Sequence, residues 1–134
     1  MKNKGFTLVE LLAVVVILGL LTAVAMVSIS NYMNRVNTEE RDTLRSTITS
    51  SLQNYRVKNN VTKGTNITLN NLSFSRPLSY SKKDCDIENS YVYFVEKKDY
   101  DGSSSVQEVF CIYLTCGNET VLNDKEENNT YCKN

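Results

Sequence analysis

The sequence predicts an α+β fold, in which a long N-terminal helix packs on a small antiparallel β-sheet. The first observation behind this prediction is that no proline or glycine interrupts residues 20–60, so one helix can continue through them. The second is that apolar residues recur at helical spacing in the later part of this stretch. The third is that β-branched and aromatic segments, separated by turn residues, follow in the C-terminal half. At 134 residues, the chain has room for one domain of ordinary size.

Residues 6–29 are almost entirely apolar, and Glu10 is the only charged residue among them. A helix of this length extends about 36 Å, which is enough to cross the hydrocarbon core of a bilayer. Lys2 and Lys4 precede the segment and are expected to stay in the cytoplasm, because positive charges are retained there. The sequence therefore predicts a membrane-spanning helix at residues 6–29, with residues 30–134 on the extracytoplasmic side.

Three simpler interpretations compete for this segment: a cleavable secretory signal, a plain membrane anchor and a buried core helix. The basic start and Ala23-Val24-Ala25, which resembles a signal peptidase site, favour a secretory signal. Glu10 counts against it, because the hydrophobic region of a signal peptide is ordinarily uncharged. A lone carboxylate costs about 2.5 to 3.5 kcal/mol at the centre of a membrane helix, and less near its end. Glu10 is therefore a candidate functional residue, and the nearest group that can pair with it is an amine.

The residues around Glu10 form a longer motif. Lys4-Gly5-Phe6-Thr7-Leu8-Val9-Glu10, followed by the apolar run from Leu11 to Gly19, resembles the N-terminal signature of type IV pilins and pseudopilins. The resemblance implies that a prepilin peptidase cuts between Gly5 and Phe6, which makes residues 1–5 a leader peptide. It also implies that the same enzyme methylates the new amino group of Phe6. Glycine before the cut allows the backbone to pass close to an enzyme's active site.

In this family, the glutamate at the position of Glu10 neutralises the N-terminal ammonium of a neighbouring subunit and is needed for assembly. Glu10 lies four residues after Phe6, about one helical turn, so the two groups can pair within or between subunits. The sequence departs from the family pattern in one respect. Many pilins carry a helix-distorting proline near the position of Val27, whereas the only proline here is Pro77. Gly19 is present at the family's other weak point, so the resemblance leaves local melting of the helix there open.

Beyond residue 29 the pattern becomes amphipathic, and we expect the helix to continue to about residue 58 within an extracytoplasmic headgroup. Its apolar positions are Val36, Leu44, Ile48, Leu52 and Tyr55. The central positions are too few for sustained heptads, so this face is expected to pack on a sheet of the same chain. A charge cluster on this helix is either a solvated face or a contact between subunits. Its members are Arg35, Glu39, Glu40, Arg41 and Asp42.

Residues 59–84 are polar and contain several turn residues, so we expect mainly a loop, with one short strand at residues 67–69. Residues 91–95 and 106–114 are rich in β-branched and aromatic residues, and Asp101-Gly102 between them is a turn signal. These two segments therefore predict a hairpin. The remaining expected strands are residues 119–122 and residues 130–132.

The four cysteines are Cys85, Cys111, Cys116 and Cys132. Disulfides are favoured over a zinc site, because the spacing contains no Cys-x-x-Cys motif and the chain has no histidine. Three pairings are possible. Cys111 with Cys116 is the least attractive, because five residues of strand separate the Cα atoms by about 16 Å. The resemblance to pilins, in which a disulfide commonly closes the C-terminal loop, favours Cys116 with Cys132, and this leaves Cys85 with Cys111.

No catalytic arrangement is evident, because histidine is absent and the acidic residues are either scattered or in the solvated run 124–127. No cofactor or metal is expected. The resemblance implies a structural subunit of a type IV pilus or pilus-like filament, assembled as a homo-oligomer with other pilins. The implied partners are a prepilin peptidase and an inner-membrane assembly platform driven by an ATPase. The implied locations are the plasma membrane, as a single-pass protein, before assembly and a cell-surface filament afterwards.

Other functions remain as alternatives. Within the family, the chain could be a pseudopilin of a type II secretion or competence (DNA-uptake) system. Outside it, the alternatives are a membrane-anchored extracellular binding domain that does not polymerise and a secreted protein with an ordinary signal peptide. The net charge of zero provides no general attraction to nucleic acid. Lys82-Lys83 and Lys97-Lys98 are candidate contacts for DNA, and host surfaces are further candidate ligands.

Overall fold

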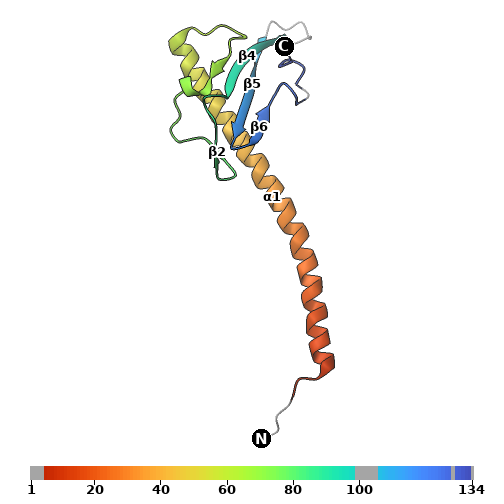
Figure 1. Cartoon of the computed structure of the whole chain (residues 1–134). Helices are drawn as coiled ribbons and strands as arrows, with labels where there is room; N and C mark the ends of the chain where they lie inside the picture. The colour runs from red at the N-terminus through yellow and green to blue at the C-terminus, as the bar shows by residue number, and fades with distance from the viewer. Residues whose placement is uncertain (1–4, 99–105, 128, 134) are drawn as a thin grey trace. The chain divides into compact units, whose positions relative to one another are not determined.

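A computed structural model describes residues 5–98, 106–127 and 129–133 of the chain. The chain forms two compact units, Met1–Thr38 and Glu39–Asn134. Helix α1 (Leu8–Asn59) contributes residues to both units, and the described strands belong to the second (Figure 1). The fold is the α+β arrangement that the sequence predicts, with one long N-terminal helix and a small antiparallel sheet.

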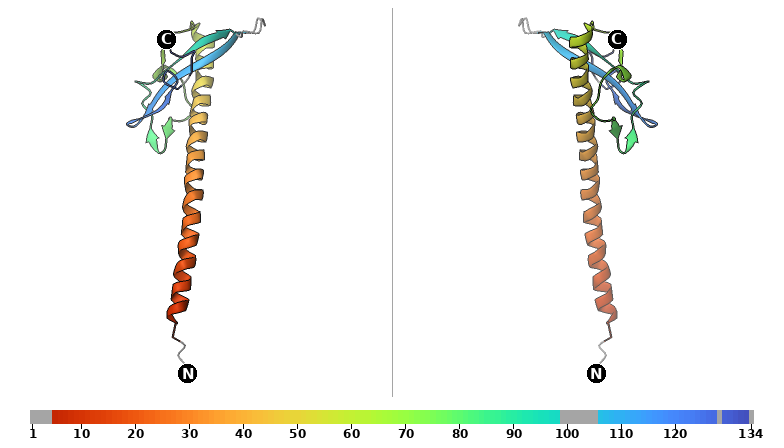
Figure 2. Two further views of the ribbon diagram at one scale, coloured as in Figure 1. Left: turned by 90° about the vertical axis from the view of Figure 1, so that its right-hand side faces the viewer. Right: turned by 90° about the vertical axis from the view of Figure 1, so that its left-hand side faces the viewer.

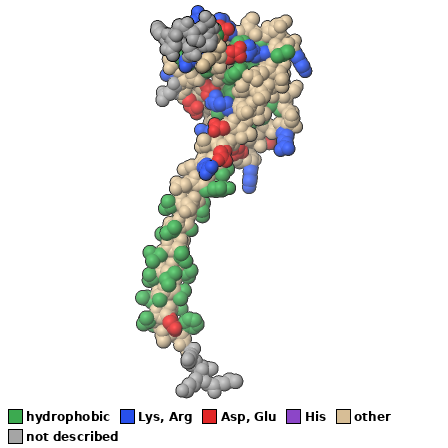
Figure 3. Space-filling model, turned by 180° about the vertical axis from the view of Figure 1, so that it is seen from behind, with side chains coloured by type: hydrophobic (Ala, Val, Ile, Leu, Met, Phe, Trp, Pro, Cys, Tyr) green, Lys and Arg blue, Asp and Glu red, His purple; other side chains and the backbone are tan. Residues whose placement is uncertain are grey.

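In the first unit, α1 begins at Leu8 and its apolar side chains are exposed along its length. This part of the helix is long and apolar enough to cross a membrane, by length and composition. Figure 3 shows hydrophobic side chains along it, whereas the lysines, arginines and acidic residues gather mainly over the second unit.

In the second unit, one face of α1 packs on the sheet (Figure 2). Leu44, Ile48 and Leu52 are spaced four residues apart, and each is at most 6% exposed. Tyr55, one residue short of the next such position, is half-buried against the same cluster. The predicted apolar face of the helix is confirmed at these four positions, whereas Val36 is half-buried and does not belong to the cluster. Burial of each of the three aliphatic side chains contributes about 1.5 to 3 kcal/mol.

The main sheet has four antiparallel strands in the order β1-β4-β5-β6. Their bounds are Ile67–Thr68 for β1, Tyr91–Lys98 for β4, Val106–Cys116 for β5 and Glu119–Asn123 for β6. The hairpin of β4 and β5 and the third strand confirm the sequence predictions, and the expected turn at Asp101-Gly102 lies outside the described residues. The short strand expected at residues 67–69 is β1, although Leu69 already opens a 3₁₀ turn, η1 (Leu69–Asn71).

The strand expected at residues 130–132 is wrong. This segment has turn and irregular backbone, and β1 takes the fourth place in the sheet. The reason is that Cys132 lies over one face of the sheet, where it is bonded to Cys111 and packs against Tyr93, and not beside an edge strand.

A second small hairpin interrupts the region expected to be loop. It is formed by β2 (Ser79–Tyr80) and β3 (Lys83–Asp84), and its two turn residues, Ser81 and Lys82, have φ angles of 50° and 63°. Such a turn usually carries Asn or Gly, so Ser-Lys gives no recognisable signal in the sequence. Two members of the charge cluster on α1 hold the hairpin: Glu40 Oε1 accepts a hydrogen bond from the backbone N–H of Ser81 at 3.0 Å, and the Arg41 guanidinium lies 5.8 Å from the centre of the Tyr80 ring.

Both faces of the sheet are covered by apolar groups, because side chains alternate along β4 and β5. Val92, Ile112 and Leu114 belong to the larger cluster, which includes the buried face of α1. Tyr93 and Cys111 point to the other face, where Cys132 completes a second, smaller cluster. The Tyr93 hydroxyl donates a hydrogen bond to the carbonyl oxygen of Cys132 at 2.8 Å, and burial raises the pKa of Tyr93.

The disulfides join Cys85 with Cys116 and Cys111 with Cys132. The pairing favoured from the resemblance, Cys116 with Cys132 and Cys85 with Cys111, is therefore wrong. The physical reason is the alternation of side chains along β5: Cys116 lies in the cluster under α1, where Cys85 packs, whereas Cys111 lies on the opposite face with Cys132. Cys111 and Cys116, the pair that the sequence made least attractive, are not bonded to each other.

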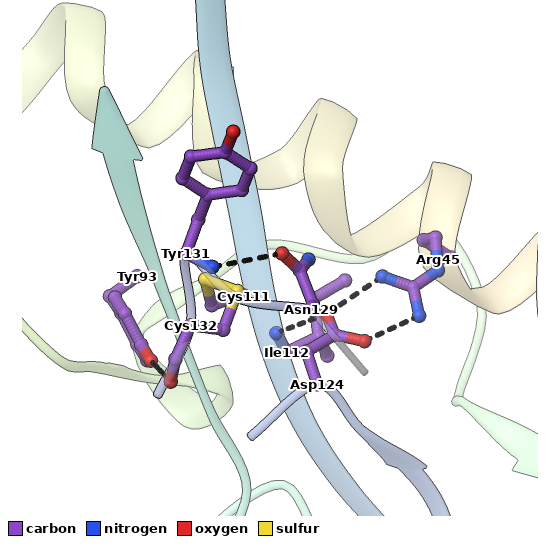
Figure 4. The surroundings of a disulfide bond; sticks show 8 residues. All are labelled: Arg45, Tyr93, Cys111, Ile112, Asp124, Asn129, Tyr131 and Cys132. Atoms are coloured by element: carbon purple, nitrogen blue, oxygen red, sulfur yellow. Dashed lines mark hydrogen bonds and ion pairs between the residues drawn. A yellow bond between two sulfur atoms is a disulfide. The ribbon is translucent and has the colours of Figure 1, made fainter. Parts of the chain in front are cut away.

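Two ion pairs connect α1 to other elements of the second unit. Arg45 pairs with Asp124 just after β6, at 2.7 Å, and Arg56 pairs with Glu108 on β5, at 2.7 Å (Figure 4 shows the first). The Arg56 guanidinium also lies 3.7 Å from the centre of the Phe94 ring. The expectation that the acidic run 124–127 is solvated is wrong for Asp124, which is 3% exposed because it is paired with Arg45.

Candidate functional site

The N-terminus of α1 is closed by reciprocal hydrogen bonds between Thr7 and Glu10. The Thr7 hydroxyl accepts a hydrogen bond from the backbone N–H of Glu10 at 3.3 Å, and the backbone N–H and the hydroxyl of Thr7 both donate to Glu10 Oε2 at 3.2 Å. The first hydrogen bond of the helix runs from the N–H of Leu11 to the carbonyl oxygen of Thr7, at 3.2 Å. This arrangement is a capping box, which satisfies N–H groups that a helix start otherwise leaves unpaired.

Gly5 and Phe6 lie immediately before this cap, in backbone that is neither helix nor strand. The Phe6 side chain is 82% exposed, and a Cβ atom placed on Gly5 would meet nothing within 4 Å. The predicted cleavage bond is therefore accessible, and no packing among the described residues requires glycine at position 5.

Glu10, the third predicted site residue, lies in the first turn of α1, four residues after Phe6. Its carboxylate is held by Thr7 in the described chain, and pairing with a free Phe6 ammonium stays a prediction, because that ammonium exists only after cleavage. The negative charge at this end of the helix is also favoured by the positive end of the helix dipole.

The surface that follows Glu10 is apolar on all sides. The large apolar side chains between Phe6 and Ile29 are 50% to 82% exposed. The hydroxyl side chains among them bond to the backbone of the same helix. Thr22 and Ser28 donate to the carbonyl oxygens of Leu18 and Val24, at 2.6 and 3.3 Å. Because these hydroxyls are already paired, the surface can enter an apolar environment without leaving them unsatisfied.

Gly19 lies in the middle of this apolar segment, and a Cβ atom there would meet nothing within 4 Å. No contact within the described chain therefore requires glycine at this position. The helix is continuous through Gly19 and through Val27, where the family's proline is missing.

The candidate DNA contacts on the second unit do not form one uninterrupted basic surface. Lys83 Nζ lies 3.6 Å from Glu119 Oε2, and Lys97 Nζ lies 5.3 Å from the centre of the Tyr131 ring. Among the described residues, no group of three or more cysteine, aspartate or glutamate side chains is arranged to hold a metal ion.

Sequence analysis missed the role of Thr7, although the signal was present. Thr7-x-x-Glu10 before an apolar run is the sequence signature of a capping box. Our interpretation assigned Glu10 only to pairing with an amine, so the local partner of its carboxylate was overlooked.

Comparison with known proteins places a family model on this same segment. Residues 1–26 match the model described as the prokaryotic N-terminal methylation motif. No curated protein and no solved structure matches the chain. The match includes Gly5, Phe6, Thr7 and Glu10 and ends within the apolar part of α1.

Proposed function

We propose that this chain is the structural subunit of a type IV pilus or pilus-like filament, because residues 1–26 match the prokaryotic N-terminal methylation motif and resemble the N-terminal signature of type IV pilins and pseudopilins. In this proposal, a prepilin peptidase removes residues 1–5 and methylates Phe6. The processed chains then polymerise through the apolar part of α1.

The observation that carries the proposal is the exposed apolar surface beginning one turn after the cleavage motif. Side chains that are 50% to 82% exposed between Phe6 and Ile29 find no cover within the described chain. Each such side chain, when fully buried, contributes about 1.5 to 3 kcal/mol, so this surface requires lipid or other helices around it. Lipid covers it before assembly, and neighbouring copies of the helix cover it in the filament.

The charge at Glu10 supports assembly rather than simple anchoring. A plain anchor gains nothing from a carboxylate in an apolar segment, which costs free energy there. Cleavage after Gly5 creates an ammonium on Phe6, and a neighbouring Glu10 carboxylate can then neutralise it. Once both groups are buried among helices, removal of either one costs about 3 to 5 kcal/mol.

The second unit supports an extracytoplasmic headgroup. Its two disulfides are typical of an oxidising compartment, and the lysines preceding the membrane segment favour a cytoplasmic location for the leader. The further partners in this proposal are an ATPase-driven assembly platform in the plasma membrane and other pilins, and the final location is the cell surface.

The mass of the N-terminus tests the proposal. Intact mass spectrometry of the chain from its native cells should find a protein that begins at N-methylated Phe6. A chain beginning at Met26 would identify a secreted protein, and an uncleaved Met1 would identify a simple anchor; either result would overturn the proposal. Electron microscopy of cells with and without the gene then tests filament formation, which should disappear with the chain.

A further inference from the structure

We propose that Thr7 is a positioning residue for cleavage of the Gly5–Phe6 bond, an inference that rests on the proposed function. Its hydroxyl fixes the residue at which α1 begins and thereby keeps the bond to be cut outside the helix. Glu10 takes part in the same capping box. In this proposal the motif therefore serves processing through the cap and assembly through the charge of Glu10.

The geometry assigns this task to Thr7 because its hydroxyl both accepts and donates a hydrogen bond in the cap. The hydroxyl accepts the N–H of Glu10 at 3.3 Å and donates to Glu10 Oε2 at 3.2 Å. Thr7 is the second residue after the Gly5–Phe6 bond, and α1 begins at the very next residue, Leu8. The cap therefore stops the helix just before it would include the cleavage site.

The surroundings of the helix make this stop necessary. In an apolar medium, N–H groups at a helix start are costly when unpaired. Without the Thr7 hydroxyl, extension of the helix through Phe6 and Gly5 becomes more favourable. Extension moves the unpaired N–H groups of the helix start toward the lysine-containing leader and water. The cap makes this extension less favourable, because the N–H of Glu10 is already paired with the Thr7 hydroxyl.

Helix extension would hinder the peptidase. Hydrolysis breaks the bond between the Gly5 carbonyl carbon and the Phe6 nitrogen; water supplies the hydroxyl of the Gly5 carboxyl group, and the Phe6 nitrogen keeps the electron pair and takes a proton. An enzyme must reach both sides of this bond, whereas in an extended helix the backbone on both sides is coiled and the Gly5 carbonyl oxygen accepts a hydrogen bond from the following turn. Binding then depends on the fraction of chains in which the segment is open.

The test is a cleavage assay with the full chain in detergent micelles and a purified prepilin peptidase. Thr7→Val keeps the shape of the side chain but removes both hydrogen bonds of its hydroxyl. Because only the open fraction binds, we expect KM to rise by about threefold to thirtyfold, with little change in kcat. Thr7→Ser keeps the hydroxyl and should restore KM to near the wild-type value.

Thr22→Val is the matched control. It removes a hydroxyl from the same helix, one that donates to the carbonyl oxygen of Leu18 and does not contact the helix start. We expect this variant to be cleaved with wild-type KM and kcat. As an independent measurement, the Cα chemical shifts of Gly5 and Phe6 in micelles should move toward helical values in Thr7→Val and not in Thr7→Ser.

The outcomes separate this inference from the proposed function. If wild-type chain is not cut between Gly5 and Phe6, the proposed function fails. If wild-type chain is cut there but Thr7→Val has the same KM and kcat, only the positioning role of Thr7 is overturned. A fall in kcat at unchanged KM would also overturn it, because the hydroxyl would then affect a step after binding.

Discussion

Arg45 and Asp124 form a bidentate ion pair, in which Nη1 and Nη2 of the arginine each lie 2.7 Å from one carboxylate oxygen. Asp124 Oδ2 also accepts a hydrogen bond from the backbone N–H of Ile112 at 2.8 Å. The pair thus joins α1 to the residue after β6 and to the backbone of β5 (Figure 4). The hydrogen bonds to Asp124 raise the pKa of Arg45.

Asp124→Asn should lower the free energy of unfolding by about 2 to 3 kcal/mol, because the variant loses the buried negative charge and one of its two hydrogen bonds with Arg45. Urea denaturation of the full chain in detergent micelles, followed by near-ultraviolet circular dichroism, measures this difference. Glu126→Gln is the matched control, since Glu126 is an exposed carboxylate two residues away, and it should change stability by less than about 0.5 kcal/mol. Equal stability of the two variants would contradict a structural role for the pair.

The disulfide pairing can be read from a non-reduced digest. Chymotrypsin cuts after Tyr113 and thereby separates Cys111 from Cys116. We expect mass spectrometry to find the Cys116 peptide linked to the peptide of Cys85, and the Cys111 peptide linked to that of Cys132. A link between Cys116 and Cys132 would instead support the pairing common in pilins and would contradict the assignment of the two cysteines of β5 to opposite faces.

Lowering the pH should reduce the free energy of unfolding of the second unit, partly through protonation of Glu108. Hydrogen bonds from Arg56 lower the pKa of Glu108 below its ordinary value of 4.5. A carboxyl group with a depressed pKa in the folded state stabilises the fold above its unfolded pKa, and this contribution is lost as pH falls through the folded pKa. Unfolding free energies measured at about pH 7, 5 and 3 should therefore fall less steeply in Glu108→Gln than in the wild type.

The size of this effect is limited, because the Glu108 side chain is 39% exposed and solvent screens the pair. We expect a contribution below about 1 kcal/mol. A double-mutant cycle with Arg56→Met provides the control: when Arg56 is already replaced, Glu108→Gln should no longer change the slope between about pH 5 and pH 3. An unchanged effect in that background would show that Arg56 is not its cause.

Glu10→Gln should separate processing from assembly. Glutamine can replace glutamate in a capping box, so the start of α1 should persist and the chain should still be cleaved and inserted in the membrane. Filament assembly should fail, because the neutral amide cannot neutralise a buried Phe6 ammonium. Immunoblots for the processed chain and electron microscopy for filaments check both parts; normal filaments from this variant would refute the role of the Glu10 charge.

Much of the start of α1 could be predicted from the sequence, although the helix was expected to begin at Phe6 and begins at Leu8, after the Thr7 cap. The motif from Gly5 to Glu10, the apolar run and the capping signature are all local patterns, and local hydrogen bonds and hydropathy are enough to interpret them. The same is true of the Leu44, Ile48 and Leu52 face, because helical spacing alone places these residues on one side. The hairpin of β4 and β5 was predictable because its strands alternate and carry β-branched and aromatic residues.

The remaining features depended on tertiary structure, because they join residues far apart in the chain. Whether Cys111 meets Cys85 or Cys132 is decided by the face of β5 on which it lies and by the return path of the C-terminal segment. Asp124 belongs to a charged run that appears solvated in the sequence, and only the approach of Arg45 from α1 makes its burial favourable. The sequence by itself thus determined the apolar segment of the helix and the surface that it exposes, whereas the packing of α1 on the sheet decided which cysteines bond and which charges are buried.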